Sequence, residues 1–223
     1  MTPGYSHTNE CIDAIPAGMD ANREDRILSI GGSGDQGFAL LEYANSVTNI
    51  DREKAQTEYI LDRIEALRQG EYDKFFQVYE DEVPELKTRA EKAKKYFSRT
   101  TLIEKILGRK TRLERIRGKL GSLEVKTADM HEFVRDMQSR WFSKAYLSNA
   151  VTFSKLARIN QRSFIEHLAA KLRNPGIIYI ADSEGVSLKG AYNIRIDEKL
   201  TRIAVEIAKG KQPWFPVVYR RKA

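Results

Sequence analysis

The sequence predicts an α/β fold built on a mostly parallel sheet of about seven strands. Short apolar runs alternate with amphipathic segments along the 223 residues, as in strands joined by helical crossovers. A glycine-rich turn follows the first apolar run, and an acidic residue ends the second. No stretch approaches the roughly 18 apolar residues of a spanning helix, and the first ten residues lack the apolar core of a secretory signal. We therefore expect a cytoplasmic protein.

The first part of the chain predicts two strand–helix units and then a long helical segment. The predicted elements are a strand at 27–30, a helix at 38–43, a strand at 46–50 and a helix at 52–68. Between residues 71 and 119 the helical periodicity continues without a strand. We interpret 71–119 as a helical insertion or cap within a single domain that spans residues 1–223.

The alternation of strands and helices resumes after residue 119. The predicted elements are strands at 123–126, 144–147, 176–180, 191–196 and 215–219, and helices near 130–137, 152–173 and 198–208. The five strands up to residue 180 fit a parallel order. Only about ten residues precede the strand at 191, which is short for a helical crossover. The pairing order of the last two strands is therefore left open.

Charge is distributed unevenly along the chain. The formal net charge is +7, and the bases are concentrated between Lys87 and Lys119. This segment, 87–119, predicts either a peripheral contact with an anionic surface or a solvated face. One cysteine, Cys11, and three scattered histidines provide neither a disulfide nor metal-ligand spacing. We therefore expect no metal site.

The glycine-rich turn predicts a nucleotide-type cofactor. Gly32, Gly34 and Gly37 match the G-x-G-x-x-G pattern of dinucleotide sites, and Asp51 follows at the distance of a ribose-binding acid. However, Asp35 places a carboxylate at the start of the helix, where a pyrophosphate would bind. Like charges about 4 Å apart repel by roughly 4 kcal/mol at an effective dielectric constant near 20. The turn therefore favours a cationic nucleoside without phosphate, such as S-adenosylmethionine.

Polar residues after the other strands extend this predicted site. Asp51 is expected to accept both ribose hydroxyls, although an acid here also caps a helix. Asp129, after the third strand, could accept the adenine amino group or cap its helix, and Met130 could pack beside the ring. Ser148 and Asn149, after the fourth strand, either complete the rim or cap a helix. The carboxyl ends of parallel strands bring these residues to one edge of the sheet.

The run ILSIGGSGDQGFALLEY, with NIDREKAQTEYILDRIEALRQGEYDKF behind it and YSHTNE ahead, resembles an S-adenosylmethionine-dependent family. That family includes the betaine-lipid 3-amino-3-carboxypropyltransferases, and the similarity runs loosely from Tyr5 to about Ile180. Its more specific parts are Ser33 to Gln36, Asp51 with Gln56, and the pair formed by Ser148 and Asn149.

The resemblance implies a class I methyltransferase-like Rossmann fold. It also implies transfer of the 3-amino-3-carboxypropyl group to a small-molecule or lipid nucleophile, with release of methylthioadenosine. Arg52 and Glu53 stand where asparagine and proline often follow the acid, which leaves the acceptor open. The expected cofactor-binding residues are Gly31, Gly32, Ser33, Gly34, Asp35, Gln36, Asp51, Arg52, Gln56, Asp129, Met130, Ser148 and Asn149.

Two other functions fit the same sequence. One is methyl transfer to a small molecule, which would release S-adenosylhomocysteine instead. The other is a basic cofactor-binding module that acts at RNA or membrane surfaces through 87–119. We expect a small-molecule or lipid acceptor rather than nucleic acid.

The sequence identifies no clear general base. Tyr5, His131 and Tyr146 are the candidates, although His131 could equally be a solvated or packed histidine. In the N-terminal YSHTNE, Asn9 and Glu10 are candidates for a lid over the amino-acid end of the cofactor. The alternative is that Thr8 or Asn9 only caps a helix.

Overall fold

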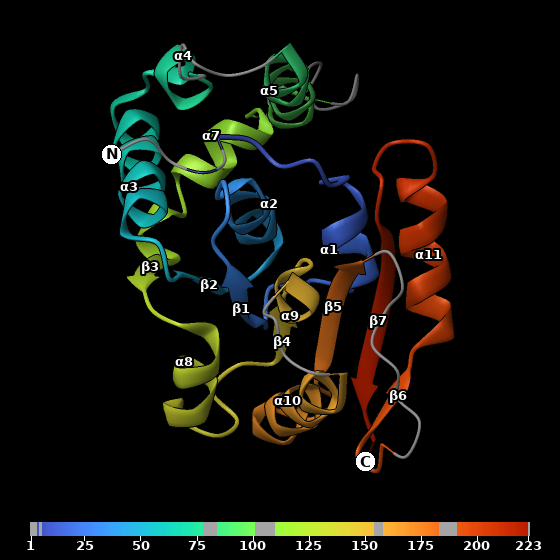
Figure 1. Ribbon diagram of the computed structural model, residues 1–223. Coiled ribbons are helices and arrows are strands. Elements are labelled where there is room, and N and C mark those ends of the chain that lie inside the picture. Colours follow the sequence, from blue (N-terminus) through green and yellow to red (C-terminus); the bar gives the residue numbers. More distant parts are fainter. Residues whose placement is uncertain are drawn as a thin grey trace.

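The computed structural model describes residues 4, 6–77, 84–100, 110–153, 158–182 and 191–222. At its centre is a seven-stranded sheet with the order β3-β2-β1-β4-β5-β7-β6 (Figure 1). The strands are β1 (Arg26–Ile30), β2 (Ser46–Asp51), β3 (Leu123–Thr127), β4 (Lys144–Tyr146), β5 (Ile177–Asp182), β6 (Ile194–Ile196) and β7 (Phe215–Arg221).

The sheet is mostly parallel, which confirms the predicted fold class. Strand β1 pairs in parallel with β2 and β4, and parallel pairing continues outward to β3 and β5. Strand β7 is antiparallel to both β5 and β6. The chain therefore returns to insert its last strand between β5 and β6, which sets the pairing order that the sequence left open.

Helices cover both faces of the sheet, because successive residues of each buried strand point to opposite sides. Ile27 and Tyr179 belong to one apolar core, and Leu28 and Ile178 to the other. The first core packs α1 (Ala14–Gly18), α2 (Asp35–Tyr43), α3 (Lys54–Gln69), α7 (Arg112–Arg117) and α11 (Glu198–Ala208). The second packs α8 (Met130–Asp136), α9 (Ala150–Phe153) and α10 (Arg158–Lys171). Among the described helices, none is both long and apolar enough to cross a bilayer.

The segment after α3 is helical, as predicted. Its described elements include α4 (Tyr72–Phe75), α5 (Pro84–Phe97) and α7 (Figure 1). The short 3-10 helix η1 (Leu120–Ser122) follows α7. Phe75 and Phe97 are fully buried and meet edge to face, with ring centroids 5.7 Å apart. Leu113 and Ile116 of α7 join the same core. The helices therefore extend the layer formed by α2 and α3. Residues 101–109 of the basic segment lie outside the described residues.

Candidate functional site

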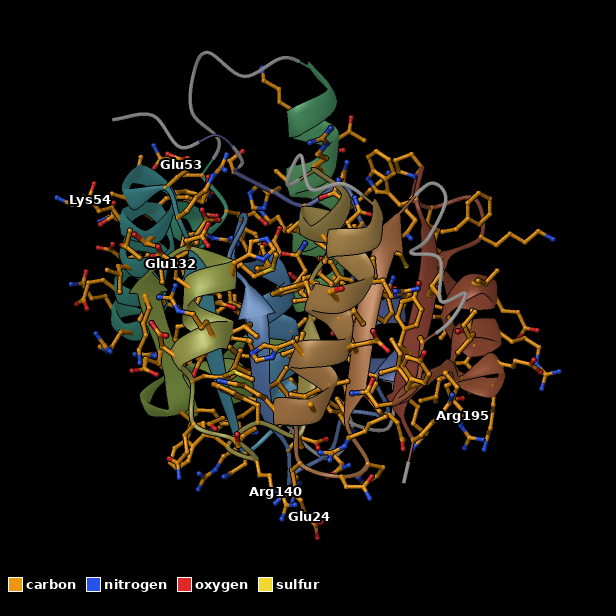
Figure 2. All side chains as sticks on the ribbon, turned by 60° about the horizontal axis from the view of Figure 1, so that its bottom comes forward. Glu24, Glu53, Lys54, Glu132, Arg140 and Arg195 are labelled. Atoms are coloured by element: carbon orange, nitrogen blue, oxygen red, sulfur yellow. The ribbon has the colours of Figure 1, made fainter. Side chains whose placement is uncertain are left out.

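A cleft of about 350 Å³ opens at the carboxyl ends of the first four strands. This is the edge where open α/β sheets bind ligands, and the volume suits a small molecule. In Figure 2, Glu53, which lines the cleft, lies toward one end of the molecule, and Glu24 lies at the opposite end. The lining residues are His7, Thr8, Asn9, Glu10, Ile30, Gly32, Ser33, Gln36, Ile50, Asp51, Arg52, Glu53, Arg89, Ala128, Asp129, Met130, His131, Tyr146, Ser148, Asn149 and Ala150.

The cleft brings together most of the residues that the sequence singles out. The predicted cofactor residues on its walls are Gly32, Ser33, Gln36, Asp51, Arg52, Asp129, Met130, Ser148 and Asn149. The lid candidates Asn9 and Glu10 and the catalytic candidates His131 and Tyr146 also line it. Gly31, Gly34, Asp35 and Gln56 do not line it, and Tyr5 lies outside the described residues.

The glycines shape the backbone of the turn and bring α2 close to the sheet. Gly32 and Gly34 have φ values of 46° and 84°, a left-handed conformation that favours glycine. A Cβ atom on Gly37 would lie 2.1 Å from Asn49 Nδ2 on β2, so only glycine fits there. Gly31 and Gly34 therefore support the turn from outside the cleft, while Gly32 is presented to it.

Asp51 ends β2 inside the cleft, as predicted. Its two carboxylate oxygens accept hydrogen bonds from the backbone amides of Gly32 and Glu53, both at 3.0 Å. Glu53, rather than Asp51, is the N-cap residue of α3. Burial raises the pKa of Asp51 above its usual value. Because an ionised carboxylate offers about four acceptor positions, Asp51 retains capacity for a pair of ligand hydroxyls.

Asp129 caps α8 and also lines the cleft. Its Oδ1 accepts bonds from the amides of His131 at 2.8 Å and Glu132 at 3.2 Å. The helix-cap alternative is therefore observed, and both bonds fall on Oδ1 alone. Met130, the next residue, is 8% exposed and belongs to the core beneath this wall. Asp129 and Met130 thus place a carboxylate oxygen beside an apolar surface.

Asp35 does not face the cleft, and this corrects the expectation that its charge acts directly on a ligand. Its Oδ1 accepts a 2.8 Å ion-pair bond from Arg63 Nη2, and its Oδ2 lies 3.2 Å from His7 Nδ1. All three side chains are at most 2% exposed. Burial by itself raises the pKa of Asp35, but Arg63 and His7 more than offset this and hold it well below its usual range. Asp35 is therefore a buried, ionised carboxylate whose charge is balanced by Arg63, and its role is structural.

The N-terminal segment lies against the first turn of α2. The Thr8 amide donates to Asp35 Oδ2 at 2.9 Å, and Thr8 Oγ1 accepts from Gln36 Nε2 at 2.5 Å. Thr8 and Asn9 do not cap α1, whose N-cap residue is Asp13. The segment thus covers the helix end at which a pyrophosphate would bind. A phosphate-free ligand is favoured for this steric reason instead of through the repulsion expected from Asp35.

Glu10 is held at the carboxyl end of β4. Its Oε1 accepts hydrogen bonds from the Tyr146 hydroxyl, at 2.8 Å, and from Ser148 Oγ. Burial raises the pKa of Glu10 to about 7. Burial and the Glu10 charge also raise the pKa of Tyr146 well above its usual value. Tyr146 therefore stays protonated and donates to Glu10, which argues against its candidacy as a base.

The remaining wall residues have mixed environments. Ser148 has a φ of 52°, a conformation that is uncommon for serine and recurs at functional sites. Asn149 Oδ1 lies 3.4 Å from Ser148 Oγ. The His131 ring packs edge-on against Phe164, with centroids 4.5 Å apart. His131 is therefore packed on one side while it lines the cleft.

Sequence reasoning missed two arginines that matter here. Arg63 lies on the apolar stripe of α3, one turn after Tyr59 and one turn before Leu67, and is 2% exposed. Arg89 lines the cleft from α5 and stands four residues before the buried Ala93. A charge within an apolar helical stripe is the signal that could have identified both residues.

The part of the chain that the structure describes shows no group of three or more His, Cys, Asp or Glu side chains able to hold a metal ion.

No family model and no curated protein matches the sequence. Solved structures do resemble its fold. A candidate rRNA methylase from Clostridium thermocellum matches with a TM-score of 0.54 and 8% identity, over 97% of each chain. A conserved hypothetical protein from Streptococcus pyogenes matches with a TM-score of 0.51 and 13% identity, over 91% of this chain and 89% of that one.

A third match is the tRNA (m1A58) methyltransferase TrmI from Aquifex aeolicus. Its TM-score is 0.50 and its identity 11%, over 99% of this chain and 73% of that one. The mostly parallel seven-stranded sheet with flanking helices thus has the class I methyltransferase-like Rossmann fold.

Proposed function

We propose that this protein is an S-adenosylmethionine-dependent transferase. The observation that carries the proposal is the pairing of Asp51, at the end of β2, with a glycine turn whose helix end is covered by Thr8. Asp51 suits a ribose diol, and the covered helix end disfavours a pyrophosphate. The insertion of an antiparallel β7 between β5 and β6 also departs from the 3-2-1-4-5-6 strand order of dinucleotide-binding sheets.

The wall residues suit the parts of this co-substrate. Asp51 would accept the ribose hydroxyls, and Asp129 with Met130 would hold the adenine. Gly32, Ser33 and Gln36 of the turn, with Arg52 at the mouth, would border the nucleoside, and Gly31, Gly34 and Gln56 would support them from behind. Ser148, Asn149 and the N-terminal segment would enclose the amino-acid end. Asp35 acts one layer deeper, by fixing that segment through Thr8.

When bound, the sulfonium supplies carbons that are activated toward a nucleophile. The protein's contribution is mainly to hold that centre and the acceptor in line. The sequence resemblance favours transfer of the 3-amino-3-carboxypropyl group to a small-molecule or lipid acceptor. Methyl transfer is the competing chemistry. The two leave different products, methylthioadenosine and S-adenosylhomocysteine.

The first experiment measures cofactor binding by calorimetry with S-adenosylhomocysteine. Asp51→Ala should weaken binding by about 100-fold or more, since two hydrogen bonds to a charged group are lost. Asp62→Ala, an exposed acid on α3, is the matched control and should leave affinity unchanged. Wild-type binding of a nicotinamide dinucleotide without binding of S-adenosylhomocysteine would refute the proposal.

The second experiment identifies the transferred group. Purified protein is incubated with S-adenosylmethionine and fractionated small-molecule and lipid extracts, and the nucleoside products are separated by mass spectrometry. Methylthioadenosine above the protein-free rate supports aminocarboxypropyl transfer. S-adenosylhomocysteine alone would assign methyl transfer and reject the finer proposal.

Contact with an anionic surface has narrower support. Lys87, Lys92 and Lys95 are exposed on α5, but neighbouring bases already have acidic partners. Arg115 binds Glu42 at 2.5 Å, and Arg99 binds Asp13 at 2.7 Å. Among the described residues, such a contact should therefore depend mainly on these three lysines of α5. Salt-sensitive retention on phosphatidylserine vesicles, weakened by neutralising the three lysines, would support it.

A further inference from the structure

The candidate site contains a buried carboxyl group to which the assignment of the cofactor gives no chemical role. Glu10 is 7% exposed, lines the cleft and belongs to the segment that docks on α2. Its Oε1 accepts hydrogen bonds from Tyr146 and Ser148. Its Oε2 is buried, and within the described chain it has no hydrogen-bond partner. A buried oxygen of this kind requires a donor, which a ligand can bring.

From this geometry we propose that Glu10 is the general base of the transfer reaction, and that the acceptor is a nucleophile that must lose a proton, an O–H or N–H compound. The inference rests on the proposed function. The positioning of Oε1 by two hydroxyl groups leaves Oε2 as the free end of the carboxylate. The sequence alone identifies no clear general base, and Glu10 can fill this role. Tyr146, one of the candidates from the sequence, instead donates a hydrogen bond to the Glu10 carboxylate.

The step balances without any further reactant. The acceptor's lone pair forms the new bond to the carbon on sulfur, and the electrons of the broken carbon–sulfur bond remain on sulfur as a neutral thioether. The acceptor proton passes to Glu10 Oε2 and later to solvent. This description holds for methyl and for aminocarboxypropyl transfer.

The titration of Glu10 supports this role. Its pKa is raised to about 7 by burial, and a base is most effective when its pKa lies near the working pH. Among the described residues, the titratable groups that interact with it are the phenols of Tyr146 and Tyr179, and the next residue in the chain is Cys11. Burial raises the pKa of both phenols well above their usual value. His7 and His131 line the same cleft. His7 lies 3.2 Å from Asp35 through its Nδ1, and His131 needs a control of its own.

A competing role for Glu10 is to pair with the ammonium group of the cofactor. A permanent counterion would be a fully ionised carboxylate, whereas Glu10 has only hydroxyl partners and no cation among the hydrogen bonds that hold it. The two roles differ in what binding does to Glu10. Pairing with an ammonium group would lower its pKa sharply, and a free base would keep it near neutrality.

The first readout needs no acceptor. Glutamate is labelled with 13C at its side-chain carboxyl, and Glu10, assigned with Glu10→Gln, is titrated alone, with methylthioadenosine and with S-adenosylhomocysteine. We expect a midpoint near pH 7 that moves by less than about one pKa unit in either complex. A fall below pH 5 with S-adenosylhomocysteine but not with methylthioadenosine would overturn the inference in favour of ammonium pairing.

The second readout uses the acceptor fraction found in the product assay. Glu10→Gln should lower kcat by about 100-fold or more, remove the rise of kcat through pH 7, and leave the affinity for S-adenosylhomocysteine within threefold. Unchanged affinity also shows that the variant is folded. His131→Asn should keep the rise through pH 7 if Glu10 is the base. Glu24→Gln, at the opposite end of the sheet, is the matched control with wild-type kinetics (Figure 2).

The outcomes separate the two proposals. Wild-type turnover with an equally active Glu10→Gln rejects the general base and leaves the transferase assignment standing. Wild-type protein that binds no S-adenosylhomocysteine rejects both.

Discussion

Asp35 and Glu10 are both buried carboxyl groups, one behind the cleft and one lining it, yet their pKa values shift in opposite directions. Asp35 has Arg63 and His7 beside it, and its pKa lies well below the usual range. Glu10 has only the hydroxyls of Tyr146 and Ser148, and its pKa rises to about 7. Burial raises the pKa of both, so the partners of Asp35, first Arg63 and then His7, make the difference. Asp35 therefore has a structural role as a permanently ionised group, whereas Glu10 can gain and lose a proton near neutral pH.

The most severe test of this comparison removes the guanidinium. Arg63→Met should leave Asp35 as a buried charge without its main partner and lower the free energy of unfolding by about 3 to 5 kcal/mol. Arg63 also donates to the carbonyls of Ser33 and Phe75, so the glycine turn and α4 each lose one further bond. The measurement is urea unfolding at pH 7.

Arg68→Met is the matched control for this test, because Arg68 is an exposed arginine on the same helix. Its ion pair with Glu65 is solvated on both sides, and its loss should change the free energy of unfolding by less than about 0.5 kcal/mol. Equal effects of the two substitutions would mean that the buried pair does not fix Asp35.

The second test uses the pH dependence of stability. The pKa of Asp35 is lower in the folded state than in the unfolded state. Its contribution to the free energy of unfolding is therefore present above its unfolded-state pKa and is lost as the pH falls through its folded-state pKa. The pH dependence for Glu10 is opposite. Its contribution to the free energy of unfolding is fully present below pH 4.5 and is lost as the pH rises through about 7. The difference between the ordinary pKa of 4.5 and the folded-state pKa of about 7 corresponds to about 3 kcal/mol of the free energy of unfolding.

Glu10→Gln should therefore gain stability relative to the wild type as the pH rises from 5 to 8, by up to about 3 kcal/mol. Urea unfolding at several pH values measures this, with Glu24→Gln as the exposed control. A constant difference between variant and wild type across this range would show that Glu10 does not titrate near neutrality in the folded protein.

The sequence predicted the frame of the site better than its electrostatics. Alternating apolar runs predicted about seven strands because burial imposes a local period on the chain. Asp51 and Asp129 line the cleft because Asp51 is the last residue of β2 and Asp129 stands two residues after β3. Arg63 could not be assigned to Asp35 from local pattern, since 28 residues separate them. The docking of Glu10 on Tyr146 spans 136 residues. Contacts of that range depend on how the sheet brings distant segments together.

The test with the smallest expected effect asks whether the hydroxyl groups that donate to Glu10 lower its pKa. Tyr146→Phe keeps the ring that packs in the core and removes the hydrogen bond to Oε1. A bond to a charged acceptor is worth about 1.5 kcal/mol at the low end, or roughly one pKa unit. The pKa of Glu10 should therefore rise by about one unit, measured by 13C titration of its carboxyl group.

Tyr179→Phe provides the control for this substitution. Tyr179 is a buried phenol beside Tyr146, with ring centroids 5.8 Å apart, and its hydroxyl has no hydrogen-bond partner among the described residues. Its loss should move the Glu10 midpoint far less than the loss of the Tyr146 hydroxyl. Equal shifts in the two variants would assign the effect to burial alone, because the donated hydrogen bond is the feature that distinguishes the two phenols.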